Sequence, residues 1–173
     1  MSNPPPPPPD HPTPTPPPSA GSTNTALRAI LTGVSVDICG SALLAFIIRA
    51  LYAVQVSTPE MTPAQIQEAV NTMPNQSPLM VLGILLGALV SVAAGYVCAR
   101  IARRNEFSAG ALMAGTTTLI SLVLSDTSQE PAELTLLFAL CSVACAMLGV
   151  MYGARQNRRI DALASAPLDT PAP

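Results

Sequence analysis

The chain has 173 residues, of which 49% are hydrophobic, 10% charged and 3% aromatic, and its mean hydropathy is +0.43. Soluble domains carry about a quarter charged residues, so this composition excludes an ordinary soluble enzyme and indicates a membrane protein. The net charge of −2 leaves no basic surface that could follow a phosphate backbone, and nucleic acid is therefore excluded as a partner.

Residues 1–25 form a separate, proline-rich segment, with eleven prolines between Pro4 and Pro18. This segment has few apolar side chains to bury, so we expect a disordered tail in extended polyproline II conformation. Two interpretations stay open. The tail is a solvated tether, or it docks into an aromatic-lined groove of a cytoplasmic partner.

Four apolar stretches are long enough to cross the ~30 Å hydrocarbon core of a bilayer, which takes ~20 residues of helix. They lie at about residues 29–48, 79–99, 107–124 and 134–153. The predicted fold class is therefore an all-α membrane protein, a four-transmembrane-helix bundle over residues 26–155 that contacts the lipid bilayer. Residues 156–173 are expected to form a disordered C-terminal tail.

The connection between the first two spans contains a helix signal. Thr62-Pro63-Ala64-Gln65 has the layout of a capping box with proline at the first helical position. We expect a short helix at about residues 63–73 that lies at the outer membrane surface or caps the bundle. A structural lid is preferred over a ligand gate.

The arginines predict the orientation by the positive-inside rule. With both termini in the cytoplasm, only Arg49 lies outside, and seven arginines lie inside: Arg28, Arg100, Arg103, Arg104, Arg155, Arg158 and Arg159. The absence of lysine beside many alanines, arginines and prolines indicates a bacterial gene, and hence a multi-pass protein of the bacterial cytoplasmic (inner) membrane.

Small residues recur every four positions in two spans, a pattern that lets helix backbones approach closely in lipid. They are Gly83, Gly87, Ser91 and Gly95 in the second span and Cys141, Cys145, Gly149 and Gly153 in the fourth, with Gly110 and Gly115 in the third. These stripes pack within the chain, against a second copy, or against other membrane helices. The two spans also share Ala-Arg-x-x-Arg-Arg, starting at Ala99 and Ala154, by duplication or by convergence on positive-inside charge.

Asp37 is the only ionisable carboxylate inside a predicted span, and an intramembrane carboxylate is a candidate functional site. Counting inward from the cytoplasmic ends predicts a polar layer of Asp37, Ser91, Thr116, Thr117 and Thr118. In the preferred hypothesis Asp37 is neutral and hydrogen-bonds a neighbouring helix. In the alternative it binds a proton or cation on a pathway.

No nucleophile elbow, phosphate loop, paired carboxylates or zinc spacing occurs, so we predict no catalytic residues, no metal and no cofactor. Cys39, Cys141 and Cys145 offer a soft-metal alternative, but cysteine also serves as a small packing residue.

The segment Ala94-Gly95-Tyr96-Val97-Cys98-Ala99-Arg100-Ile101-Ala102-Arg103, followed by Gly110-Ala111-Leu112 and Gly115, resembles the central hairpin of small uncharacterised bacterial four-span membrane proteins. The resemblance covers about a fifth of the chain, and it implies the fold without implying an activity. We therefore predict a non-enzymatic inner-membrane protein that acts as a structural or interaction subunit. The alternative is a small proton- or cation-linked transporter or channel-like protein that uses Asp37.

Overall fold

The computed structural model describes residues 21–74, 77–103, 105–124 and 132–165, and these residues form five α-helices. The helices are α1 (Gly21–Val56), α2 (Pro63–Asn71), α3 (Pro78–Ala102), α4 (Glu106–Leu124) and α5 (Ala132–Ala164). All except α2 are long and apolar enough to cross a membrane. The predicted fold class, an all-helical membrane protein with four spans, is confirmed for the part of the chain that the structure describes.

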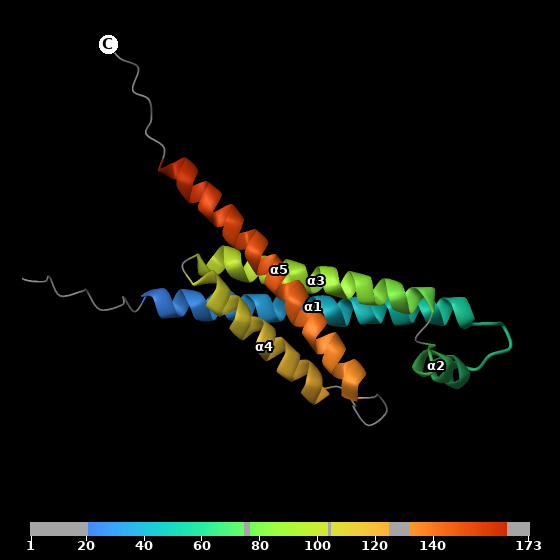
Figure 1. Ribbon diagram of the computed structural model, residues 1–173. Coiled ribbons are helices and arrows are strands. Elements are labelled where there is room, and N and C mark those ends of the chain that lie inside the picture. The colour runs from blue at the N-terminus through green and yellow to red at the C-terminus, as the bar shows by residue number, and fades with distance from the viewer. Residues whose placement is uncertain (1–20, 75–76, 104, 125–131, 166–173) are drawn as a thin grey trace, which may run out of the picture.

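The four long helices form two antiparallel pairs that cross each other. In Figure 1, α1 and α3 lie side by side, and the pair formed by α4 and α5 crosses them at an angle. Helix α3 is central because it packs against α1, α4 and α5, whereas α1 and α5 do not contact each other. Helix α2 contacts α1 alone among the described elements.

The central position of α3 follows from one stripe of its sequence. Its buried residues recur at intervals of three and four, which places them on one face of the helix. They are Ser91, Ala94, Gly95, Cys98, Ala99 and Ala102. All of them are small, so neighbouring helices approach the α3 backbone closely, and this close packing replaces the hydrophobic drive that is missing between helices in lipid.

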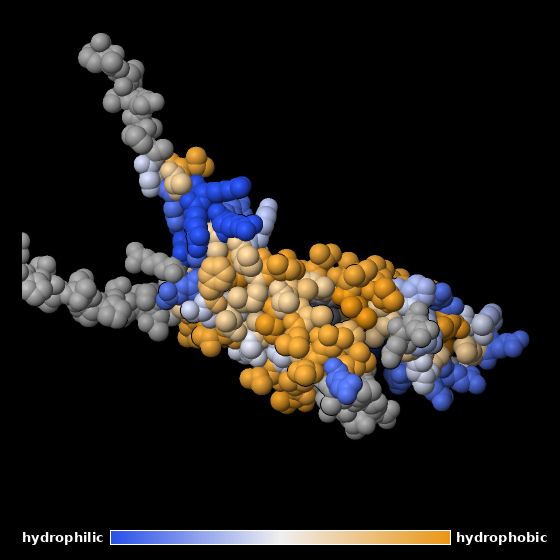
Figure 2. Space-filling model, viewed as in Figure 1, coloured by the Kyte–Doolittle hydropathy of each residue, from blue (hydrophilic) through white to orange (hydrophobic). Residues whose placement is uncertain are grey.

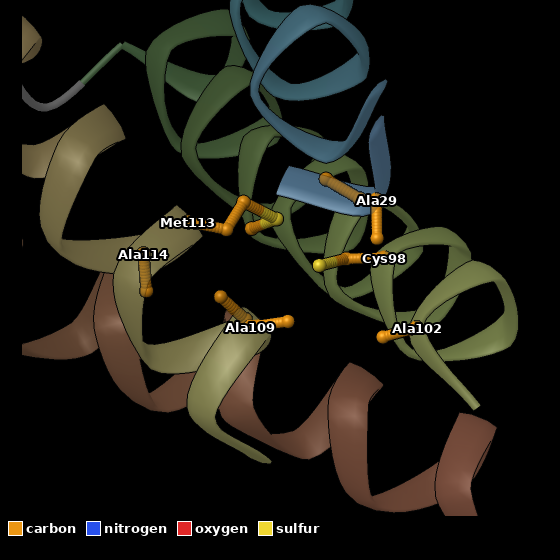
Figure 3. Close-up of a cluster of buried hydrophobic side chains, with 8 residues drawn as sticks. Ala29, Cys98, Ala102, Ala109, Met113 and Ala114 are labelled. Atoms are coloured by element: carbon orange, nitrogen blue, oxygen red, sulfur yellow. The ribbon is translucent and has the colours of Figure 1, made fainter. Parts of the chain in front are cut away.

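The core is correspondingly built from small side chains. Figure 3 shows the cluster in which alanines from α1, α3 and α4 surround the longer Met113 side chain and the Cys98 thiol. Met113 and Cys98 are fully buried. A β-carbon added at Gly33 would overlap the Met113 sulfur, so the glycine of α1 leaves the space that this flexible side chain fills.

Large hydrophobic side chains point outward instead. Figure 2 shows a belt of hydrophobic side chains over the middle of the molecule, between hydrophilic ones on the C-terminal part of α5 and around α2. Phe46, Leu89, Leu119 and Leu140, one from each long helix, are 60% to 70% exposed. Outward-facing apolar side chains on all four helices imply contact with the lipid bilayer.

The short helix α2 has the expected capping box. The Thr62 hydroxyl accepts a hydrogen bond from the Gln65 backbone N–H, and the Thr62 backbone N–H donates to Gln65 Oε1 at 2.8 Å. Pro63 occupies the first turn, where no intrahelical donor is needed. The helix ends at Asn71, two residues earlier than expected, and Thr72 caps it by donating its hydroxyl to the Glu68 carbonyl oxygen at 2.9 Å.

Two predicted boundaries are wrong. Residues 21–25, assigned to the disordered tail, form the start of α1, because no proline lies between Pro18 and Pro59 and the helix extends by more than a turn before Arg28. Residues 156–164, assigned to the C-terminal tail, continue α5 beyond the predicted end of its span. Residues 1–20 and 166–173 lie outside the described part of the chain.

Candidate functional site

The structure brings Asp37 of α1 and Ser91 of α3 together inside the helix pair. The Ser91 hydroxyl donates a hydrogen bond of 2.9 Å to Asp37 Oδ1, and each residue is only 7% exposed. Gly40, about one turn beyond Asp37, allows this approach, since a β-carbon there would lie 2.7 Å from Val90 on α3. The contact joins two helices through a buried carboxyl group and a hydroxyl.

The three threonines of α4 do not complete the predicted polar layer. The Thr116 hydroxyl donates to the Leu112 carbonyl at 2.8 Å, and the side chain is exposed. The Thr117 hydroxyl is buried and contacts the carbonyls of Met113 and Ala114 at 3.2 and 3.1 Å. Both hydroxyls therefore bond within their own helix, as threonine often does in helices.

Thr118 differs from its two neighbours. Its Oγ1 atom is buried and has no hydrogen-bond partner among the described residues. An unpaired hydroxyl in an apolar setting costs free energy, so Thr118 adds no stabilising bond to the predicted layer. The hydrogen-bonded unit of that layer is thus the Asp37–Ser91 pair.

Helices α3 and α5 approach each other closely where they cross, and the contact is reciprocal. A β-carbon at Gly95 would overlap the Ala146 carbonyl oxygen, and one at Gly149 would overlap the Val92 carbonyl oxygen. Each glycine faces the carbonyl that lies three residues before the other glycine. This places a Cα–H of each helix against a backbone acceptor of the other, the weak hydrogen bond typical of tight helix–helix contacts.

The reciprocity relates α3 to α5 by a constant offset. Gly149 follows Gly95 by 54 positions, and Ala146 follows Val92 by the same 54. The two helices run in the same direction (Figure 1), so the crossing has local two-fold character. The shared Ala-Arg-x-x-Arg-Arg motif, which starts at Ala99 and again at Ala154, repeats after 55 positions rather than 54. Both duplication of a helix pair and convergence on positive-inside charge therefore stay open.

Further contacts extend the crossing toward the end of the bundle that carries most of the arginines. A β-carbon at Gly153 would lie 2.8 Å from the Ala99 β-carbon and 2.9 Å from the Tyr96 carbonyl oxygen. The rings of Tyr96 and Tyr152 are 6.1 Å apart between centroids, and the Tyr96 hydroxyl donates to Gln156 Oε1 at 2.6 Å. Both arrangements tie α3 to α5.

The remaining predicted packing residues fall into two groups. Gly110 lies against Val150, where a β-carbon would overlap the valine side chain, and Gly83 makes ordinary contact with Ile48 at 3.5 Å. Among the described residues, nothing lies within 4 Å of a β-carbon added at Gly87 or Gly115, and Cys145 is half-buried. The stripes are therefore packed within this chain at Gly95, Gly110, Gly149 and Gly153 and open at Gly87 and Gly115.

A polar clasp that the sequence reasoning missed lies at the same end as most arginines. Asn157 of α5 is 4% exposed, and its Nδ2 donates to the Ala99 carbonyl and to Glu106 Oε1, both at 2.9 Å. Arg100 Nη1 donates to Asn157 Oδ1 at 2.8 Å. One amide thereby joins the end of α3, the start of α4 and the extension of α5.

A signal for Asn157 was present in the sequence. The four-residue spacing of Gly149 and Gly153 continues to Asn157, so this residue shares their face. Because a tail is expected from residue 156 onward, the predicted packing stripe stops at Gly153 and does not extend to Asn157. Near the clasp, α3 ends at Ala102 and is capped by Arg103, which has a positive φ of 47° and donates its N–H to the Ala99 carbonyl at 3.3 Å.

The predicted topology residues that the structure describes lie at one end of the bundle. Arg100 is partly buried in the clasp, whereas the others are exposed: Arg28, Arg103, Arg155, Arg158 and Arg159. Arg104 lies outside the described residues. Arg49 is also exposed, in the half of α1 that is remote from Arg28.

The cysteines do not gather. Cys39 and Cys141 are exposed, Cys145 is half-buried and Cys98 is buried in the core, and all four are free thiols. Within the described residues, no three His, Cys, Asp or Glu side chains come together in a way that could hold a metal ion.

No protein-family model, curated protein or solved structure matches this chain. The resemblance to small bacterial four-span proteins therefore stays a prediction.

Proposed function

We propose that this chain is a non-enzymatic membrane protein that acts as a structural or interaction subunit. The observation that carries the proposal is the hydrogen bond between Ser91 and Asp37. The one carboxyl group deep in a described span is engaged by the neighbouring helix, as expected of a polar residue that holds two helices together.

The surroundings of Asp37 support the same interpretation. A pathway for protons or cations usually brings several polar side chains together within the membrane. Here the Thr116 and Thr117 hydroxyls bond to backbone carbonyls of α4, and the core beside them packs through alanine, cysteine and methionine. These two hydroxyls form hydrogen bonds within α4 and supply no polar ligands around Asp37.

Two surfaces are candidates for contact with other molecules. Gly87 and Gly115 leave open small-residue positions on α3 and α4, where another membrane helix or a second copy can approach. The proline-rich segment before α1 is the candidate for a cytoplasmic partner, by polyproline docking.

We place the protein in the bacterial inner membrane with both termini in the cytoplasm. Supporting this orientation, Arg28, Arg100, Arg103 and the three arginines of the α5 extension lie at one end of the described bundle. The opposite end carries Glu60 and Glu68 beside or within α2. This distribution follows the positive-inside rule.

The alternative, a proton- or cation-linked transporter, rests on the same buried carboxyl group. Replacing Asp37 with asparagine separates the two functions, because the amide oxygen still accepts the Ser91 hydrogen bond but the side chain cannot ionise. Asp37→Leu removes the acceptor, and Thr116→Ala is a control at an exposed hydroxyl that bonds its own helix.

For a structural role, we expect Asp37→Asn and Thr116→Ala to unfold in detergent like the wild type. Asp37→Leu should lose about 1 kcal/mol, the scale of an interhelical hydrogen bond in lipid. Proton and cation flux into vesicles containing the wild-type protein should equal that into empty vesicles. Wild-type flux that Asp37→Asn abolishes without loss of stability would contradict the proposal and favour transport.

A further inference from the structure

The extension of α5 beyond its apolar part is a charged helical surface. Figure 2 shows hydrophilic side chains gathered over this part of α5. Arg155, Arg158 and Arg159 are all exposed, and their spacing of three and four residues places them on one face. Because Asn157 clasps the extension to α3 and α4, these arginines are held at a fixed position beside the membrane-spanning part of the bundle.

The positive charge of this surface is not neutralised within the described part of the chain. Neither an ion pair nor a hydrogen bond engages the three guanidinium groups there. Two described acidic residues lie at this end: Glu106, whose carboxylate accepts from Asn157, and Asp161, on the extension itself. Asp161 lies three residues after Arg158 and offsets only one of the charges.

Apolar side chains border the arginines. Ile160 is 40% exposed and Leu163 is 77% exposed, and their spacing of three residues places them on a neighbouring face of the extension. A helix with arginines on one face and apolar residues beside them, directly after a membrane span, suits the interface between headgroups and acyl chains.

From these observations we propose that Arg155, Arg158 and Arg159 bind the headgroups of anionic phospholipids, with Ile160 and Leu163 reaching toward the acyl chains. Guanidinium groups donate to phosphate oxygens in a planar, two-pronged geometry, and an anionic headgroup supplies the net negative charge that the protein lacks here. Each basic residue beside a span on the cytoplasmic side is attracted to the anionic headgroups of the adjacent leaflet. This interaction would anchor the α5 extension whichever role the bundle serves.

The test compares lipid binding by the full chain in a neutral detergent, measured by native mass spectrometry with phosphatidylglycerol and with phosphatidylcholine. The triple variant Arg155→Gln/Arg158→Gln/Arg159→Gln removes the charge, and the corresponding triple lysine variant keeps it. Arg49→Gln is the matched control, because it removes one exposed arginine from the remote half of α1. Circular dichroism checks that each variant is folded.

We expect the wild type to prefer phosphatidylglycerol by about tenfold or more. The glutamine variant should lose that preference, whereas the lysine variant and Arg49→Gln should keep it. Millimolar inorganic phosphate should not displace the lipid. The proposal is overturned if the glutamine variant keeps the preference, if Arg49→Gln loses it equally, or if inorganic phosphate competes as well as the lipid does.

Discussion

The two halves of α3 carry the same spacing of small residues and use it differently. In the half near its start, a β-carbon added at Gly83 would make ordinary contact with Ile48, and one added at Gly87 would have no described residue within 4 Å. In the half near its end, Ser91 bonds Asp37, and Gly95 lies against the backbone of α5. A four-residue stripe therefore identifies a face on which helices can meet, without identifying how much of that face is used.

The difference arises from the crossing of the two helix pairs. Because α4 and α5 cross the α1–α3 pair at an angle, α5 meets α3 over a limited stretch and then diverges (Figure 1). Where they meet, only hydrogen fits at Gly95 and Gly149. Beyond that stretch, Gly87 has no neighbour among the described residues, and its lack of a side chain brings no packing gain there.

The largest expected effect is at the reciprocal glycines. Gly149→Ala places a methyl group against the Val92 carbonyl and the Tyr96 backbone nitrogen, and neither backbone atom can move without separating the helices. We expect a loss of about 3 kcal/mol in the free energy of unfolding, at the upper end of the usual cost of overpacking. Reversible unfolding in mixed detergent micelles measures this change.

Gly87→Ala is the matched control, since it is the same substitution in the open half of α3. It should stay within about 1 kcal/mol of the wild type, because alanine favours helix and would meet no neighbour within the described part of the chain. A loss at Gly87 as large as that at Gly149 would break the comparison, and would indicate that a second chain covers the open half.

A smaller effect is expected about two turns beyond the crossing. Asn157→Asp replaces the amide donor that binds the Ala99 carbonyl, and it places a carboxylate beside Glu106. The loss should be about 2 kcal/mol, since removing a buried hydrogen-bonding partner costs roughly 1–3 kcal/mol. Chemical denaturation in detergent measures the change.

The control for this variant is Gln156→Glu, which makes the same change from amide to acid at an exposed neighbour. Glutamate can still accept from the Tyr96 hydroxyl, so its effect should be near zero. Equal losses in both variants would mean that added negative charge, rather than the clasp, determines the result.

Several features of the bundle could be predicted from the sequence because each depends on one segment alone or on the depth of a residue in the membrane. The four spans follow from hydrophobic length, the capping box at Thr62 from local spacing, and the meeting of Asp37 with Ser91 from depth in the membrane. Hydrophobic length, capping residues and counting along a helix can be read without knowing how the helices cross.

Sequence patterns do not predict contacts that depend on where and at what angle two helices cross. Gly87 and Gly95 have the same small-residue spacing, and the path of α5 alone distinguishes them. The Thr116 and Thr117 hydroxyls bond to carbonyls of their own helix, because a carbonyl of the preceding turn lies within reach of each. The polar composition around Asn157 predicts a tail, but its buried amide is satisfied because the end of α3 and the start of α4 both lie beside this part of α5.

The smallest expected effect lies farthest from the crossing, in α2. Thr62→Ala removes the hydroxyl that accepts from the Gln65 N–H, and loss of such a cap costs about 1 kcal/mol of helix stability. Because α2 packs on α1 alone among the described elements, this loss should stay local. Hydrogen exchange in the amides of α2 should rise about fivefold, the equivalent of about 1 kcal/mol, with exchange at the α3–α5 crossing unchanged. Thr62→Ser, which keeps the hydroxyl, should restore protection. If exchange also rose around Gly95, α2 would be coupled to the α3–α5 crossing. The two halves of α3 could then not be treated as independent.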